Sequence, residues 1–359
     1  MDYDQNEHPP VAPLPGQSDG GGSGPLPPIA PVGGASGPAP KRKGGGLRIL
    51  WGILLFLSVL ANIGLFVMLI AVVMVFAAGQ RPGLNESIVR EGPASVKIAV
   101  INVQGVIHSQ LAEDVRRQLK AASKDSRVRG VIVRVNSPGG TISGSDQIHN
   151  EILRFRREHG KPVIAFQQSV AASGGYYASV ACEKIIAEPT AITGSIGVIS
   201  WWLVVQELLE DKLGVQAVTV KSGLKKDWPS SFRPPTEEEI AYMDERLIQP
   251  AFKRFKEVIV EGRKSVLTRD EIDKLADGGI FVAEQAKAED LIDDIGYLDD
   301  AIAAVRKMAK IGKARVVEYR RPFSLMDIMS YKTESLLKLD RSTLYELSCP
   351  QVLYLWTAY

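Results

Sequence analysis

A run of small residues in the middle of the chain, Val170 to Tyr177, contains the serine best suited to nucleophilic chemistry. Ser173 follows an apolar segment typical of a buried strand, 162–166, and precedes the start of a predicted helix, 176–181. On a strand-to-helix turn a serine hydroxyl is exposed, and the N–H groups that follow it point toward incoming negative charge. Small-residue turns also serve packing alone. The turn by itself therefore leaves both catalysis and packing open.

Metal and cofactor chemistry has no support in the sequence, so we expect neither. The two cysteines have no metal-type spacing, and the four histidines are scattered, at His8, His108, His149 and His159. We expect Cys182 to be a buried free thiol. If Ser173 is a nucleophile, its base should therefore be a residue other than histidine.

Strands and helices alternate through residues 96–310, which predicts one compact α/β domain with a largely parallel sheet. The β-branched segments 96–103, 128–135, 184–187 and 215–220 are expected to be strands, in addition to 162–166. Apolar spacing predicts helices over 114–122, 145–158 and 203–213. A capping box at Thr236 opens a long helix to about residue 261.

The segments on either side of this domain differ sharply in composition. Residues 1–46 are rich in Pro, Gly and Ser and are expected to be a disordered tail. Residues 47–78 are apolar over a length that predicts one transmembrane helix, which would contact membrane lipid. Basic residues concentrate before this helix, so the tail should be cytoplasmic and the domain extracytoplasmic. Residues 79–95 are expected to be a linker and 311–359 an extension that serves packing or oligomer contacts. The net charge of +2 gives no indication of nucleic-acid binding.

Several motifs together resemble the signal peptide peptidase A family of membrane-anchored serine proteases, in its short single-domain form. They are Asn136 to Gly140, Ala172 to Tyr177, Thr193 to Ile199, and Lys221 to Gly223 with Lys226 and Asp227. They occur in family order over roughly residues 96–310. The resemblance implies a Clp/crotonase-type fold of packed ββα units and peptide hydrolysis by a Ser/Lys dyad.

By position in these motifs, the resemblance implies that Ser173 is the nucleophile and Lys226 the general base. Ser195 would orient the lysine. The N–H of Gly174, with that of Gly139 or Gly140, would form the oxyanion hole. Lys225 is the alternative base, and Lys226 is favoured because it directly precedes Asp227. A lysine is a base at neutral pH only if burial lowers its pKa from about 10.4 to near 7.

The family resemblance implies an endopeptidase that hydrolyses residual signal peptides and similar apolar peptides near the membrane. It also implies a homo-oligomer in which the serine and the lysine can come from neighbouring subunits. Two alternatives are a catalytically silent peptide-binding scaffold and a crotonase-like acyl-CoA enzyme. A membrane anchor and a Ser/Lys pair have no evident use in the latter.

Overall fold

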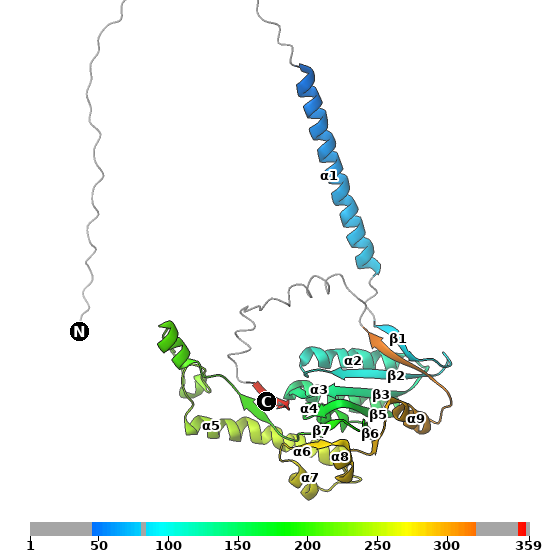
Figure 1. The fold of residues 1–359 in the computed structure, drawn as a ribbon, viewed down its shortest axis with the longest axis vertical. Coiled ribbons are helices and arrows are strands. Elements are labelled where there is room, and N and C mark those ends of the chain that lie inside the picture. Colours follow the sequence, from blue (N-terminus) through cyan, green and yellow to red (C-terminus); the bar gives the residue numbers. More distant parts are fainter. Residues whose placement is uncertain (1–44, 80–83, 321–350, 357–359) are drawn as a thin grey trace, which may run out of the picture. The chain divides into compact units, whose positions relative to one another are not determined.

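The computed structural model describes residues 45–79, 84–320 and 351–356 (Figure 1). The chain divides into two compact units, Met1–Phe76 and Ala77–Tyr359. The first contains all but the last three residues of the helix α1 (Gly45–Gly79). Within this helix, Arg48–Met74 has a mean hydropathy of 2.7 and is long enough to cross a membrane. This apolar helix coincides with the predicted span 47–78. The predicted tail 1–46 lies outside the described residues, apart from the start of α1.

The second unit is built on a mostly parallel sheet, in which the described strands follow the order β1-β11-β2-β3-β5-β6-β10. Only β1 and its neighbour β11 are antiparallel along this path, while β7 continues beside β5 and pairs in turn with β9. The bounds are β1 (Asn85–Arg90), β2 (Lys97–Gln104), β3 (Val128–Ser137), β5 (Val163–Ala172), β6 (Lys184–Ala187), β7 (Ile192–Gly194), β9 (Ile280–Val282), β10 (Asp294–Ile295) and β11 (Arg315–Arg320).

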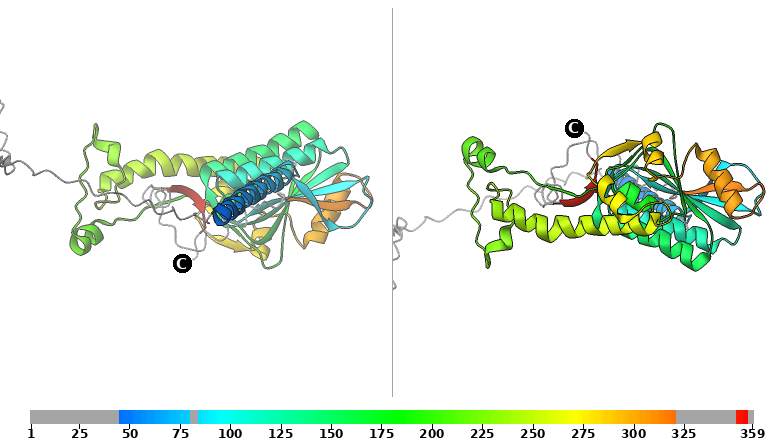
Figure 2. Two further views of the ribbon diagram at one scale, coloured as in Figure 1. Left: turned by 90° about the horizontal axis from the view of Figure 1, so that it is seen from above. Right: turned by 90° about the horizontal axis from the view of Figure 1, so that it is seen from below.

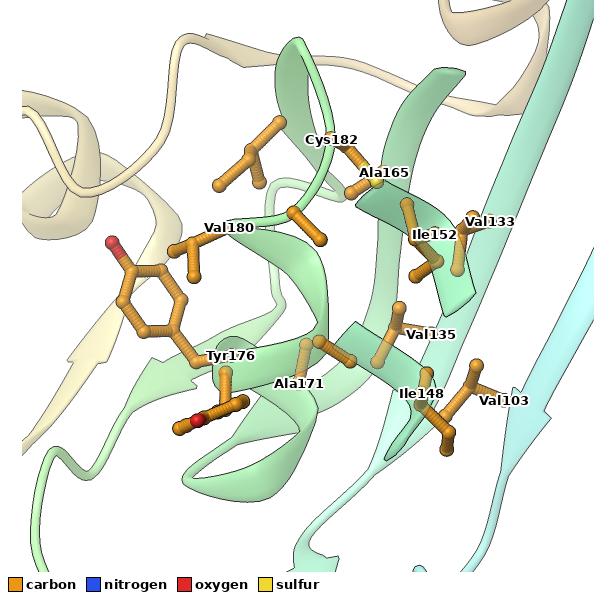
Figure 3. Packing of buried hydrophobic residues seen from close by; sticks show 14 of the residues in the cluster. Val103, Val133, Val135, Ile148, Ile152, Ala165, Ala171, Tyr176, Val180 and Cys182 are labelled. Carbon is orange, nitrogen blue, oxygen red and sulfur yellow. The ribbon is translucent and has the colours of Figure 1, made fainter. Parts of the chain in front are cut away.

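Both faces of the sheet are covered, which explains the nearly continuous apolar sequence of its strands. Along β2, alternate residues point to opposite faces. Ile98 and Val100 belong to the cluster that includes α9, whereas Ile101 and Val103 belong to the larger cluster with α2 and α3. Figure 3 shows part of that larger cluster. The helices of the unit are α2 (Ser109–Lys124), α3 (Ile142–His159), α4 (Gly174–Ser179), α5 (Glu237–Met243), α6 (Gln249–Arg263), α7 (Arg269–Leu275), α8 (Ala283–Ala288) and α9 (Leu298–Met308).

A second, smaller sheet brings the C-terminal segment into the domain. The strand β12 (Gln351–Leu355) lies between β4 (Gly139–Thr141) and β8 (Ile199–Trp201), antiparallel to both. The N–H of Trp356 extends this pairing by donating to the carbonyl of Pro138 over 2.8 Å. Part of the expected extension 311–359 thus packs on the rest of this unit.

The segment that joins β8 to α5 extends away from the sheet in all three views (Figures 1 and 2). It includes two short helical turns, η1 (Leu208–Lys212) and η2 (Leu224–Asp227), and we call residues 202–235 the arm. The side chains of Val218 and Val220 in the arm are 83% and 96% exposed.

The α/β class and the parallel sheet predicted from sequence are confirmed, with the expected strands 96–103, 128–135 and 184–187 found as β2, β3 and β6. The predicted strand 215–220 is wrong, since this segment of the arm has no strand structure. Its β-branched residues favour an extended backbone, but no neighbouring strand of the described chain pairs with it. The helix that begins after Thr236 has the predicted capping box and runs through α5, η3 (Asp244–Ile248) and α6. Cys182 is a buried free thiol, as predicted.

Candidate active site

Three neighbouring strands end side by side, and the candidate residues follow their ends. Within the sheet, Ser137 at the end of β3 lies opposite Ala171, and Ala172 at the end of β5 lies opposite Gly194 at the end of β7. Because β3, β5 and β7 are parallel, their carboxyl ends share one edge, where ligands of open α/β sheets bind. The segments that follow, which begin at Pro138, Ser173 and Ser195, are therefore brought together.

Ser173 occupies a strained turn between β5 and α4. Its backbone has φ 53° and ψ −113°, a region that costs a residue with a side chain about 1–3 kcal/mol. Two hydrogen bonds hold this turn: the Ser173 N–H donates to Gly194 over 2.7 Å, and the Ser173 carbonyl accepts from Tyr177 over 2.9 Å. The residue is 1% exposed, so the expectation of an exposed hydroxyl on this turn is wrong for the single chain. The serine is thus fixed at the strand ends by its backbone.

The glycines predicted to form the oxyanion hole are packed closely against each other. A Cβ added to Gly139 would lie 2.7 Å from the nitrogen of Gly174, and one added to Gly174 would lie 3.1 Å from the Cα of Gly139. The first distance is shorter than real Cβ contacts and the second is tighter than most of them, so a side chain at either position would displace its neighbours. Gly139 also has φ +101°, which a side chain would strain.

The N–H groups of Gly139 and Gly140 differ in their partners and in their direction. The Gly139 N–H already donates to the hydroxyl of Ser137 over 3.1 Å. The Gly139 carbonyl accepts from Ile107 over 2.7 Å. Because a trans peptide directs its C=O and N–H to opposite sides, the Gly140 N–H points away from Ile107 and toward β12.

Ser195 lies beside Ser173 through the pairing of β5 with β7. Its backbone φ of 50° is again in the left-handed region, and its N–H donates to Gly279 over 2.7 Å. The residue is 7% exposed. Ser195 therefore lies near Ser173, whereas Lys226, which it was expected to orient, lies in the arm.

Lys226 is not brought to Ser173 within one chain. It lies exposed on η2 in the arm, and its side chain makes no hydrogen bond, ion pair or ring contact within the part of the chain that the structure describes. Lys225, the alternative, places its Nζ 4.2 Å from the ring centroid of Tyr242 and 5.0 Å from that of Trp228. These cation–π contacts occupy Lys225 and leave Lys226 the freer of the two.

The acidic neighbour of Lys226 is bound elsewhere. Asp227 accepts a hydrogen bond from Lys221 over 2.7 Å, and Arg233 lies 3.5 Å away. The Lys221 bond, with a smaller contribution from Arg233, lowers the pKa of the Asp227 carboxyl. The carboxylate is therefore ionised and held within the arm.

An aromatic cluster beside α4 supplies apolar surface next to the candidate nucleophile. The ring of Tyr177 contacts His149 and Phe255, with centroids 5.2 and 5.1 Å apart, and its hydroxyl donates to Asp146 over 2.6 Å. A cavity of about 470 Å³ opens here, with Tyr177 and Asp146 in its lining. Burial lowers the pKa of His149 to about 4, so this imidazole is neutral at pH 7. The role of His149 is packing against Tyr177.

Sequence reasoning missed two serines that support the glycines. The hydroxyl of Ser137 donates to Gly105 over 2.6 Å in addition to accepting from Gly139. The buried Ser145 hydroxyl donates to Thr141 over 2.9 Å and fills the space beside Gly174. Ser137 was visible within its Ser-Pro-Gly-Gly motif, whereas nothing near Ser145 in sequence indicates its contact with Gly174.

Comparison with known proteins connects this site to a protease family. A model of peptidase family S49 matches residues 155–312, a stretch that includes Ser173, Ser195 and Lys226. A protein of Enterococcus faecium named as a signal peptide peptidase SppA is 38% identical over 248 residues, which are 66% of this chain and 71% of that protein. Protease 4 of Salmonella typhi is 34% identical over 59% of this chain but only 33% of its own length. Among solved structures, a ClpP1 of Listeria monocytogenes aligns with 56% of this chain and 94% of that one, at 20% identity and a TM-score of 0.38.

Proposed function

The chain belongs to peptidase family S49, the signal peptide peptidase A family of serine proteases, and we propose that it is a membrane-anchored endopeptidase with a Ser173/Lys226 dyad. The observation that carries the site assignment is the strained turn at Ser173, with Gly174 directly after it and Gly140 across from it. The apolar helix α1 supports the membrane anchor. Apolar peptides near the bilayer, such as residual signal peptides, are the proposed substrates.

The proposed reaction uses these groups in two stages, formation of an acyl-enzyme and its hydrolysis. The Ser173 hydroxyl gives its proton to the neutral amine of Lys226 and attacks the scissile carbonyl carbon. The oxygen of that carbonyl becomes negative and is stabilised by the N–H groups of Gly174 and Gly140, each worth about 3–4 kcal/mol in such sites. The protonated lysine then passes its proton to the leaving amine. Water, deprotonated by the same lysine, hydrolyses the acyl-enzyme.

We further propose that Lys226 reaches Ser173 of a neighbouring copy. Lys226 is exposed in the arm and Ser173 is buried at the sheet edge, so a single chain leaves the pair apart. The arm also exposes apolar side chains that a solvated segment has no reason to carry: Leu203, Leu208, Leu213, Val215, Val218, Val220 and Leu224. If this surface docks on the next copy, the same contact would bury the apolar side chains and exclude water from Lys226. Repetition of such a head-to-tail contact closes a ring.

Mixing two inactive variants tests both the dyad and its shared origin. Ser173→Ala and Lys226→Ala are each expected to abolish cleavage of a fluorogenic apolar peptide, whereas Lys225→Ala should retain it. Co-expressed in equal amounts, the two inactive chains should recover about a quarter of wild-type activity, because one in four head-to-tail contacts joins an intact serine to an intact lysine. If the two variants assemble but recover no activity, either Lys226 acts on Ser173 of its own chain or it is not the base. Full activity of Ser173→Ala would overturn the nucleophile.

A further inference from the structure

The turn that carries Lys226 sets the direction in which this lysine points. Within η2, the N–H of Lys226 donates to the carbonyl of Gly223 over 3.0 Å. This bond spans three residues, the spacing of a 3₁₀ turn, in which successive side chains point about 120° apart. The side chains of Lys225, Lys226 and Asp227 therefore leave the turn in three different directions.

Asp227 anchors one side of this turn. The Nζ of Lys221 donates to the Asp227 carboxylate over 2.7 Å and to the carbonyl of Leu224 over 3.1 Å, so it joins the last residue of η2 to the first. The second carboxylate oxygen lies 3.5 Å from the guanidinium of Arg233, and only 16% of the Asp227 side chain is exposed. The carboxylate is thus engaged by these two cations and not by Lys226.

Arg233 connects this anchor to the first turn of α5. Its guanidinium donates to both oxygens of Glu239, over 2.7 and 2.6 Å. Glu239 is 1% exposed and also accepts from the Thr236 N–H over 2.7 Å, within the capping box that begins the helix. A bidentate pair between a guanidinium and a buried carboxylate fixes both groups in position. The contacts from Asp227 through Arg233 to Glu239 therefore tie η2 to α5.

Lys225 anchors the other side of the turn to the same helix. Its Nζ lies 4.2 Å from the ring centroid of Tyr242, and the Tyr242 ring meets that of Trp228 edge to face, with centroids 5.7 Å apart. Glu239 and Tyr242 are three residues apart in α5, so they lie on one face of that helix. Both anchors of η2 thus end on the same face of α5.

Lys226 takes the one direction that these anchors leave open. Two of the three side chains of the turn, those of Lys225 and Asp227, are directed toward α5, so the side chain between them points away from the helix. A cation–π contact at an exposed site is weaker than a hydrogen bond between two charged groups. Asp227 therefore supplies the main restraint on the turn.

We propose that Asp227 is a positioning residue for the base: with Lys221 and Arg233 it holds η2 on α5, so that Lys226 points toward the neighbouring copy. This role rests on the proposed function, in which Lys226 serves Ser173 of that copy. Asp227 acts through the lysine and does not touch the peptide. Its loss therefore affects proton transfer and not substrate binding.

The first experiment measures turnover by the full-length protein in detergent. Asp227→Ala should lower kcat for a fluorogenic apolar peptide about tenfold, because small displacements of a catalytic group are costly. KM should change by less than about twofold, since peptide binding does not involve this carboxylate. Lys221→Met should have the same effect. Lys221→Arg keeps a cation that donates to Asp227, so its kcat should stay within about threefold of that of the wild type.

The matched control is Asp273→Ala, which also removes a carboxylate bonded to a lysine. Asp273 accepts from Lys256 over 2.6 Å and lies on α7, outside the arm. The kcat of this control should equal that of the wild type, and size-exclusion chromatography should show the same assembly for every variant. An unchanged kcat in Asp227→Ala, or a loss of kcat that accompanies a loss of assembly, would overturn the proposal.

The second experiment needs no catalysis, so it separates this role from the proposed function. Hydrogen exchange of residues 223–229 is followed by mass spectrometry in Ser173→Ala and in Ser173→Ala/Asp227→Ala. We expect exchange in this segment to be about tenfold faster in the double variant, while unchanged exchange in β3 shows that the fold is intact. Equal exchange in the two proteins would refute the positioning role alone. An active Lys226→Ala would refute the proposed function and this role with it.

Discussion

The hydroxyl of Ser137 is predicted to hold the oxyanion site in shape, and its removal should cost both stability and rate. Ser137 is fully buried and its oxygen joins the N–H of Gly139 to the carbonyl of Gly105. In Ser137→Ala the buried Gly139 N–H is left unpaired, a cost of about 1–3 kcal/mol. The Gly105 carbonyl belongs to an exposed residue and can bind water, so losing its hydrogen bond to Ser137 costs only about 1 kcal/mol. The free energy of unfolding should therefore fall by about 2–4 kcal/mol in total.

The effect on rate follows from the peptide that Ser137 anchors. A Gly139 N–H without a partner turns toward any acceptor, and the adjoining Gly140 N–H then moves from the position of the developing oxyanion. Loss of one such donor lowers kcat by about 100-fold in comparable sites, with KM changed less. Urea unfolding followed by circular dichroism gives the stability, and cleavage of a fluorogenic peptide gives kcat. The control is Ser123→Ala, which removes an exposed hydroxyl bonded to Lys120 within α2. A Ser137→Ala protein that matches this control in both readouts would refute the reasoning.

Three further predictions concern separate parts of the domain. Gly174→Ala should lower kcat at least 100-fold, because the new Cβ would lie 2.3 Å from the Ser145 hydroxyl. Adding Ser145→Ala should raise kcat again about tenfold. If the losses in kcat of the two single variants simply add in the double variant, this contact does not explain the effect. Hydrogen bonding to Arg233 lowers the pKa of Glu239 from 4.5 to about 2, so the stabilisation by this pair is complete above pH 4.5 and lost as the pH falls toward 2. The thermal midpoint of Arg233→Ala should therefore lie below that of the wild type at pH 7 and meet it near pH 2; a constant difference would exclude this linkage. Burial raises the pKa of the Cys182 thiol, so this thiol should react slowly with alkylating reagents. In a variant that lacks the second cysteine, alkylation at pH 8 should be at least 100-fold slower in the folded protein than in urea. Equal rates would show that the thiol is accessible.

Much of the sheet was predictable because its strands are buried on both faces. Segments such as 128–135 and 184–187 are rich in β-branched residues and bounded by turns, so their local preference and their tertiary environment agree. The capping box at Thr236 is equally local, since both hydrogen bonds involve residues three apart. The same local reasoning failed at 215–220, where a β-branched sequence has no partner strand in the described chain.

The candidate site was only partly predictable because its contacts join distant segments. The turn at Ser173 and the glycines at 139 and 140 carry signals in their own residue types. By contrast, the hydrogen bond from the Gly139 N–H to Ser137 depends on the conformation of one loop, which the residue types do not specify. The arrival of Tyr354 beside Gly140 joins residues more than two hundred positions apart. An aromatic C-terminus indicated packing contacts, but no periodicity in the sequence specifies that β12 pairs with β4 and β8.

Because Lys226 is exposed in the single chain, the proposed assembly would also control the activity of the enzyme. Within one chain Lys226 lies exposed in the arm and makes no hydrogen bond or ion pair with the described residues. The arm that carries Lys226 is also the most exposed apolar segment of the domain, with Val218 and Val220 almost fully accessible. On the proposed arrangement, one docking event buries the apolar arm, desolvates the amine and delivers it to Ser173 of the next copy. An isolated chain would then lack a base, so on this proposal hydrolysis would require assembly. A protease anchored among membrane proteins would gain from this requirement, because it limits cleavage of folded neighbours.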